Sequence, residues 1–175
     1  MTSNLPLAHI YNLGRLGNAG DLVAFAAKDA ERALIARWSG IVSVETFEAR
    51  VEIAKLAPNR FGLSFLLIAD VTQACVVTLE PVKSRMERRF NRELQFHGPA
   101  RHRQAPAESG ELVLDTEEEG PEEIESLHYD LAGPVLEEFV LSLEPYPRCP
   151  GVEFSPKTDK QDRPDSPFAV LKGLK

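Results

Sequence analysis

The sequence predicts an α+β protein: an antiparallel β-sheet covered by two main helices, with a mobile acidic loop and a C-terminal tail. In the stretch 61–82, apolar residues occupy the odd positions from Phe61 to Val71, the two-residue period of a strand with one buried face. The stretches 29–39 and 134–144 instead place apolar residues at the spacing of amphipathic helices. With 43% hydrophobic and 27% charged residues, the composition is that of a globular domain.

Five strands are expected in the sheet, at residues 5–13, 21–27, 44–54, 61–77 and 83–96. Glycines between the first two predict a hairpin, and residues 57–60 supply a turn between the third and the fourth. Residues 83–96 fit a helix or a strand, but a third antiparallel strand is the simpler choice after two paired strands. Leu66 and Ile68 make both faces of the fourth strand apolar, so we expect it at the centre of the sheet with its second face covered.

The two helices have recognisable ends. Asp29 stands where a capping side chain is favoured, and Gly40 stands where a helix commonly stops. Trp38 is the only tryptophan, and its position favours a role as a core anchor at the end of the first helix. In the second helix, Pro134 lies in the first turn and Pro145 at the stop.

The domain organisation is expected to be one domain over residues 1–151 and a flexible tail over 152–175. Within the domain, residues 98–122 are rich in Pro, Gly and Glu, which predicts a disordered acidic excursion. The tail ends in a Ser-Pro pair followed by apolar residues at helical intervals, a pattern typical of a short docking helix. The candidate partner-binding residues there are Phe168, Leu171 and Leu174.

The net charge is −7, and the charges are strongly segregated. From Lys83 to Arg103 there are seven basic residues against two acidic ones, whereas from Glu108 to Asp130 there are ten acidic residues and no basic one. The candidate RNA-binding residues are Arg85, Arg88, Arg89 and Arg92, which we expect on one face, with Arg85 and Arg89 on a common polar side. Arginine contacts phosphate with two hydrogen bonds and stacks on bases, although these arginines could equally decorate a solvated face. The acidic run is a solvated linker, a shield over the basic strand, or a binding segment for a basic protein.

No catalytic constellation can be assembled from the sequence. Cys75, His97, His102 and Cys149 lack the short spacing that makes zinc sites specific, so we expect no metal and no cofactor. Cys75 lies on an apolar strand, where a thiol is usually inert, and two cysteines so far apart are no disulfide framework. An enzyme remains an option only if folding brings His97, His128 and acidic groups into one cleft.

No membrane or export segment is expected. The longest purely apolar run, residues 65–69, is far shorter than the ~20 residues that a membrane helix needs. The first residues show no basic stretch followed by an apolar one. We therefore expect a soluble cytoplasmic protein without a membrane partner.

Four blocks of the sequence, taken together, resemble a known family. They are residues 69–82, Asp130 and Leu131 with the acidic helix that follows, residues 146–148, and residues 166–172. Their order and spacing are similar to those of the YceD family of large ribosomal RNA subunit accumulation proteins. The family-motif residues in this chain are Cys75, Glu80, Pro81, Asp130 and Glu137.

The resemblance implies a non-catalytic factor in ribosome biogenesis that promotes accumulation of large-subunit ribosomal RNA. Its implied partner is that RNA or a pre-ribosomal particle, and no cofactor is implied. An alternative is an acidic adaptor that holds a basic ribosomal protein without touching RNA. Many relatives carry C-x-x-C where this chain has Cys75 and Thr78, which leaves a lone thiol and further disfavours metal binding.

Overall fold

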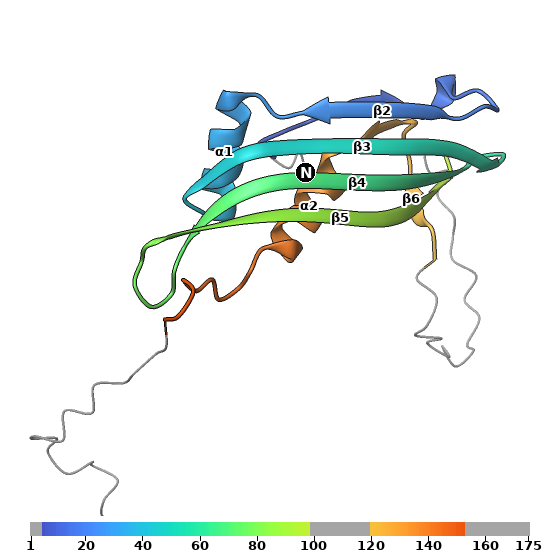
Figure 1. The fold of residues 1–175 in the computed structure, drawn as a ribbon. Coiled ribbons are helices and arrows are strands. Elements are labelled where there is room, and N and C mark those ends of the chain that lie inside the picture. Colours follow the sequence, from blue (N-terminus) through green and yellow to red (C-terminus); the bar gives the residue numbers. More distant parts are fainter. Residues whose placement is uncertain (1–4, 99–119, 153–175) are drawn as a thin grey trace, which may run out of the picture.

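The computed structural model describes residues 5–98 and 120–152. Its elements are β1 (Ile10–Asn12), the 3-10 helix η1 (Leu13–Arg15), β2 (Asp21–Ala26), α1 (Asp29–Ser39), β3 (Ser43–Ala57), β4 (Arg60–Ala74), β5 (Pro81–Phe96), β6 (Glu122–Ile124), β7 (His128–Asp130) and α2 (Ala132–Ser142). A mostly antiparallel sheet with two helices confirms the α+β class (Figure 1). Most of the expected acidic excursion and nearly all of the expected tail, with its docking helix, lie outside the described residues.

Five strands form the main sheet in the order β2–β3–β4–β5–β6, which places β4 at the centre as predicted. Strands β2 to β5 are antiparallel to their neighbours, whereas β6 pairs in parallel with the end of β5. Strands β3 and β4 are joined by a tight turn in which Asn59 has a φ of 64°. Asparagine tolerates this left-handed conformation better than most residues, so the turn follows from the local sequence.

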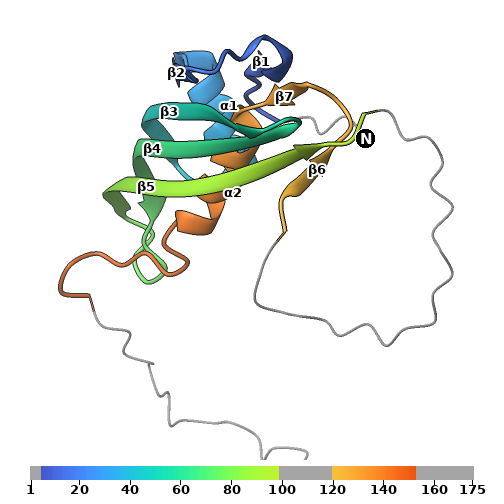
Figure 2. The ribbon, with the colours of Figure 1, turned by 90° about the vertical axis from the view of Figure 1, so that its right-hand side faces the viewer.

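The core lies between one face of the main sheet and the two helices. Figures 1 and 2 show both helices on the same side of the sheet. Alternate residues of β4, from Phe61 to Val71, are buried on that side. Helix α2 contributes Val135, Leu136 and Phe139, which have no exposed surface. The ring of Phe139 meets that of Phe47 edge-on, with 5.3 Å between the ring centroids.

The second face of β4 differs from the prediction. No element among residues 5–98 and 120–152 covers it, and Leu66 and Ile68 are half-buried there. The prediction of a covered second face is therefore wrong. The physical reason is that these side chains lie between long charged side chains of β3 and β5, whose aliphatic parts shield apolar surface without a second layer.

The N-terminal segment also differs from the prediction. Of the expected strand at 5–13, only Ile10–Asn12 forms, and it pairs with β7 in a separate two-stranded sheet. The expected hairpin with β2 is wrong, because β2 pairs with β3 instead. The ring of His9 stacks on that of Phe25 with 4.6 Å between the centroids, so this segment packs against β2 through side chains.

Helix α1 has the predicted bounds and ends at Gly40, whose φ is 72°. The residue before the first turn is Lys28 rather than Asp29, and the Glu31 carboxylate accepts the Lys28 N–H at 2.7 Å. Trp38 is 43% exposed, so the prediction of a core anchor is wrong. Helix α2 begins and ends two residues earlier than predicted. Neither helix, nor any other in the described part of the chain, is long and apolar enough to span a membrane.

Candidate interaction surface

The four candidate arginines of β5 do not share one face of the sheet. Arg88 and Arg92 lie opposite Leu67 and Leu63, which are buried in the core. Because cross-strand partners point to the same side, these two arginines point toward the helices. Arg85 and Arg89 have the other parity and point to the uncovered side, so the expectation of one face bearing all four is wrong.

The two arginines on the helix side have partners within the domain. Arg92 donates a hydrogen bond of 2.6 Å to Glu137 of α2 and lies 3.6 Å from Glu122 of β6. Arg88 donates to the hydroxyl of Ser142 at 3.0 Å. Glu122 also accepts the Tyr129 hydroxyl at 3.1 Å, and burial first, then this carboxylate, raise the pKa of Tyr129. These contacts connect β5 to α2 and β6.

The uncovered face of β3, β4 and β5, which we call the open face, carries its charges in rows across the strands. One row places Glu48 and Glu87 on either side of Ile68. The next row places Arg50 and Arg89 on either side of Leu66. Each of these two apolar residues is thus flanked by like charges, and the two rows have opposite sign.

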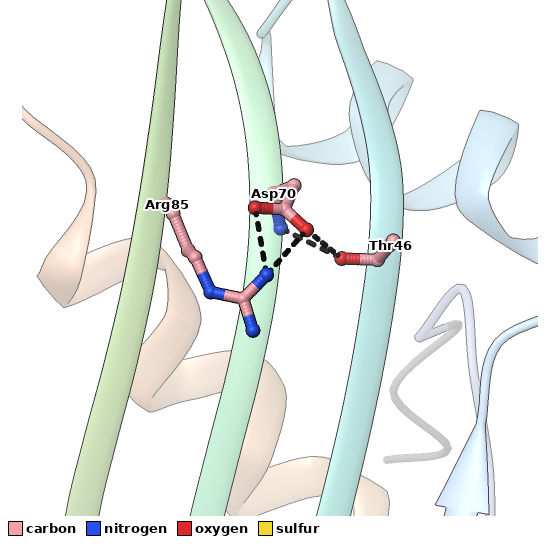
Figure 3. A network of polar contacts seen from close by, with 3 residues as sticks. All are labelled: Thr46, Asp70 and Arg85. Carbon is pink, nitrogen blue, oxygen red and sulfur yellow. Dashed lines mark hydrogen bonds and ion pairs between the residues drawn. The ribbon is translucent and has the colours of Figure 1, made fainter.

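A third row, Thr46, Asp70 and Arg85, is held together by hydrogen bonds (Figure 3). The Thr46 hydroxyl donates to Asp70 Oδ2 at 2.6 Å and accepts the Asp70 N–H at 3.0 Å. Arg85 Nη1 donates to both oxygens of the same carboxylate, at 3.2 and 3.4 Å. The row therefore ties β3, β4 and β5 together on the side away from α2, which Figure 3 shows behind the strands.

Both open-face arginines of β5 keep hydrogen-bonding capacity. The side chain of Arg85 is 66% exposed, and only its Nη1 group contacts Asp70. The side chain of Arg89 is 77% exposed and contacts Glu87 at 3.2 Å through Nη2. A guanidinium has five N–H donors, so each arginine can bind a further phosphate or carboxylate. Any such ligand must compete with a neighbouring carboxylate.

The family-motif residues lie where elements of the fold contact one another or where the chain turns between them. Asp130 accepts the N–H of His9 at 2.7 Å and that of Ala132 at 3.0 Å, so it fixes the start of α2 against the N-terminal segment. Glu137 is the partner of Arg92. The other three, Cys75, Glu80 and Pro81, lie in the turn from β4 to β5 and at the start of β5.

The candidate metal and catalytic residues are only partly brought together. Cys75 and Cys149 are neighbours, a contact that their separation in sequence did not indicate. His97 follows the far end of β5, 3.5 Å from Glu123, and His128 lies opposite Asn12 in the small sheet. Across 5–98 and 120–152, no three His, Cys, Asp or Glu residues are arranged to hold a metal ion. His102, like the candidate partner-binding residues Phe168, Leu171 and Leu174, lies outside the described residues.

Fold and surface together define a class: an α+β domain with one charged sheet face that no element among the described residues covers. A family model described as "Large ribosomal RNA subunit accumulation protein YceD" matches residues 63–175. The chain therefore belongs to this family, which the four sequence blocks had indicated. The description names accumulation of an RNA and no chemical reaction. No curated protein and no solved structure matches the chain.

Proposed function

We propose that the chain is a non-catalytic ribosome biogenesis factor that binds large-subunit ribosomal RNA, or an RNA–protein assembly intermediate, through its open face. The family match carries this proposal, because the family is described by its effect on that RNA. The open face supports it with exposed guanidinium groups at Arg50, Arg85 and Arg89. The proposal assigns Arg88 and Arg92 to the stability of the domain and not to RNA.

The row around Leu66 suits an unpaired RNA segment. Arg50 and Arg89 stand two strand spacings apart, about 10 Å, with Leu66 between them. Guanidinium groups contact phosphates and stack on bases, and an apolar side chain between them can receive the face of a base. Double-stranded RNA offers no exposed base faces, so we expect single-stranded loops to be preferred.

The test is ultraviolet crosslinking of the tagged protein in cells, with sequencing of the bound RNA. The variant is Arg85→Glu with Arg89→Glu, and the control is Arg15→Glu with Arg37→Glu, which makes the same charge change at exposed positions off the sheet. We expect crosslinks to large-subunit ribosomal RNA to be lost in the first pair and kept in the second. Equal loss in both pairs, or none in either, would contradict an open-face site.

The acidic adaptor remains a second candidate because Glu48 and Glu87 flank Ile68 on the same face and the net charge is −7. A basic ribosomal protein would fit such carboxylates, with the acidic segment and Phe168, Leu171 and Leu174 as further proposed contacts. Deletion of residues 108–119 leaves β6 intact, since β6 begins at Glu122. If the adaptor is correct, this deletion removes a co-purifying basic ribosomal protein, and the intact chain gives no crosslinks to large-subunit RNA.

A further inference from the structure

Two thiols lie close together at the end of β4, where the chain turns toward β5. Cys75 follows β4 and Cys149 follows α2, and they are 74 residues apart in sequence. The N–H of Cys149 donates to Cys75 Sγ at 3.4 Å. Thr78 Oγ1 lies 3.7 Å from Cys149 Sγ, so the hydroxyl stands beside the second thiol. Both cysteines are free thiols in this structure.

Backbone contacts hold the two segments in place. The Val76 N–H donates to the carbonyl of Pro147 at 2.9 Å, which fastens the segment after α2 to the turn after β4. Within that turn, the Leu79 N–H donates to the Cys75 carbonyl at 2.9 Å, and the Cys75 N–H donates to the Glu80 carbonyl at 2.8 Å. Backbone hydrogen bonds therefore fix the positions of the two cysteines, and their proximity does not depend on a side-chain contact alone.

The two thiols differ in acidity and access. Hydrogen bonds from the Thr78 side chain, then from the backbone of Thr78 and Cys149, lower the pKa of Cys75 to about 6 against the effect of burial. For Cys149, the Thr78 hydrogen bond favours the thiolate, but burial, the Cys75 contact and the Glu80 charge together raise the pKa. Cys75 has no exposed surface, whereas Cys149 is half-buried. A reagent therefore reaches Cys149 first, with an ionised Cys75 beside it.

We propose that Cys75 and Cys149 form a reversible disulfide by exchange with a low-molecular-weight disulfide. Cys149 loses its proton to solvent, and its sulfur attacks one sulfur of the reagent, which releases one thiolate. The Cys75 thiolate then attacks the Cys149 sulfur and releases the second thiolate. Two protein thiols are oxidised to one disulfide, and the reagent is reduced to two thiols.

The bond would link the exit of α2 covalently to the turn that leads into β5. That linkage now depends on hydrogen bonds such as Val76 to Pro147 and the Gln73 amide to the Glu144 carbonyl, at 2.9 Å each. Arg85 lies four residues beyond Pro81, where β5 begins. Oxidation would therefore restrain the turn between β4 and β5 and the start of β5, the strand that carries Arg85 of the proposed binding face. This effect does not depend on which ligand the face binds.

The test treats the purified full chain with glutathione buffers of increasing oxidation, then blocks the remaining thiols with a maleimide and measures intact mass. We expect a monomer that is about 2 Da lighter, accepts no maleimide and carries no glutathione. Dithiothreitol should restore both thiols. A glutathione adduct that persists at Cys149, or a disulfide only between two copies of the chain, would overturn the proposal.

Two matched variants identify each step. Cys75→Ser should stop the reaction at a stable glutathione adduct on Cys149, and Cys149→Ser should leave Cys75 unmodified because it is buried. Thr78→Val retains both thiols but loses the hydroxyl contacts, so its disulfide should form several-fold more slowly. Circular dichroism of each variant checks that the fold is intact. An identical rate in Thr78→Val and wild type, or a Cys75→Ser protein that forms no glutathione adduct at Cys149, would also overturn the proposal.

Discussion

Arg92 of β5 donates a hydrogen bond of 2.6 Å to Glu137 of α2. The sequence suggested one of these residues as an RNA contact and the other as a family motif, and the fold makes them partners. Arg92 also lies 3.6 Å from Glu122, so it joins β5 to both α2 and β6. Two carboxylates of the same domain balance the charge of Arg92. For this reason we propose the open face, and not Arg92, as the RNA-binding surface.

The Arg92–Glu137 pair should stabilise the domain measurably. The side chain of Arg92 is 35% exposed and has two carboxylate neighbours, whereas the side chain of Arg89 is 77% exposed and, among the described residues, pairs with Glu87 alone. A double-mutant cycle with Arg92→Ala and Glu137→Ala, read by urea unfolding, should give a coupling free energy of about 1 kcal/mol. The matched cycle at Arg89 and Glu87 should give about zero. Equal coupling free energies in the two cycles would show that the contact with α2 stabilises the domain no more than the exposed pair does.

Removing one charge from the open face should strengthen RNA binding if that face is the site. Asp70→Asn deletes the carboxylate that faces Arg85 and leaves Thr46 a polar neighbour. We expect affinity for a large-subunit RNA fragment to rise several-fold, and the slope of log affinity against log salt to steepen by about one. Asp29→Asn is the control, because Asp29 also pairs with an arginine, Arg32, but lies on α1. A gain in both variants would indicate only an effect of net charge.

The packing of α2 against the sheet should provide much of the stability. Phe139 has no exposed surface and meets the ring of Phe47. Phe139→Ala should lower the free energy of unfolding by about 3–5 kcal/mol, through lost burial and an unfilled cavity. Its neighbour Val140 is 40% exposed, so Val140→Ala should cost less than about 1 kcal/mol. Comparable losses in a chemical unfolding experiment would contradict this orientation of α2.

Leu79 occupies a backbone conformation that suits glycine. Its φ is 63° and its side chain is 78% exposed, so it has strain without much compensating burial. Leu79→Gly should raise the free energy of unfolding by about 0.5–1 kcal/mol, because the left-handed strain exceeds the extra entropy lost by glycine. The converse change, Gly40→Ala at a φ of 72°, should lower it by about 1 kcal/mol. Thermal unfolding measures both, and a destabilised Leu79→Gly protein would refute the strain.

Stability should depend on pH through Cys75. The pKa of this thiol in the folded protein is about 6, below its ordinary value of 9.0. Between these values the unfolded chain holds a proton that the folded protein has lost, so the contribution to stability grows as the pH rises and disappears below pH 6. Urea unfolding of wild type and Cys75→Ser, in reductant, should show a stability difference that shifts in favour of wild type between about pH 5 and about pH 9. A pH-independent difference would mean that the thiol is not acidic.

Local patterns predicted the long elements well. The two-residue alternation of β4 is set by which side chains must be buried, and it places β4 at the centre of the sheet as expected. The turn at Asn59 and the stop of α1 at Gly40 depend on local backbone preferences, which a single sequence displays directly. Strand β6 was missed because three residues are too few to show a period.

The candidate site was only partly predictable. The sequence identified β5 as the basic strand and gave Arg85 and Arg89 a common polar side, and the register bears this out. The sequence pattern placed Arg88 and Arg92 in the same group, because all four arginines lie in one basic stretch of the chain. A pleated strand sends such neighbours to opposite faces, so a cluster in sequence need not be one in space.

By itself, then, the sequence determined the α+β class, the central strand, both helices and the family, because each depends on local spacing or on the order of blocks along the chain. Only the tertiary structure decided that Arg92 meets Glu137, that β1 pairs with β7, and that Cys75 lies beside Cys149. These are contacts between segments distant in sequence, and they are fixed by how the whole core packs. No local pattern encodes that packing, which is why they emerge only in the folded chain.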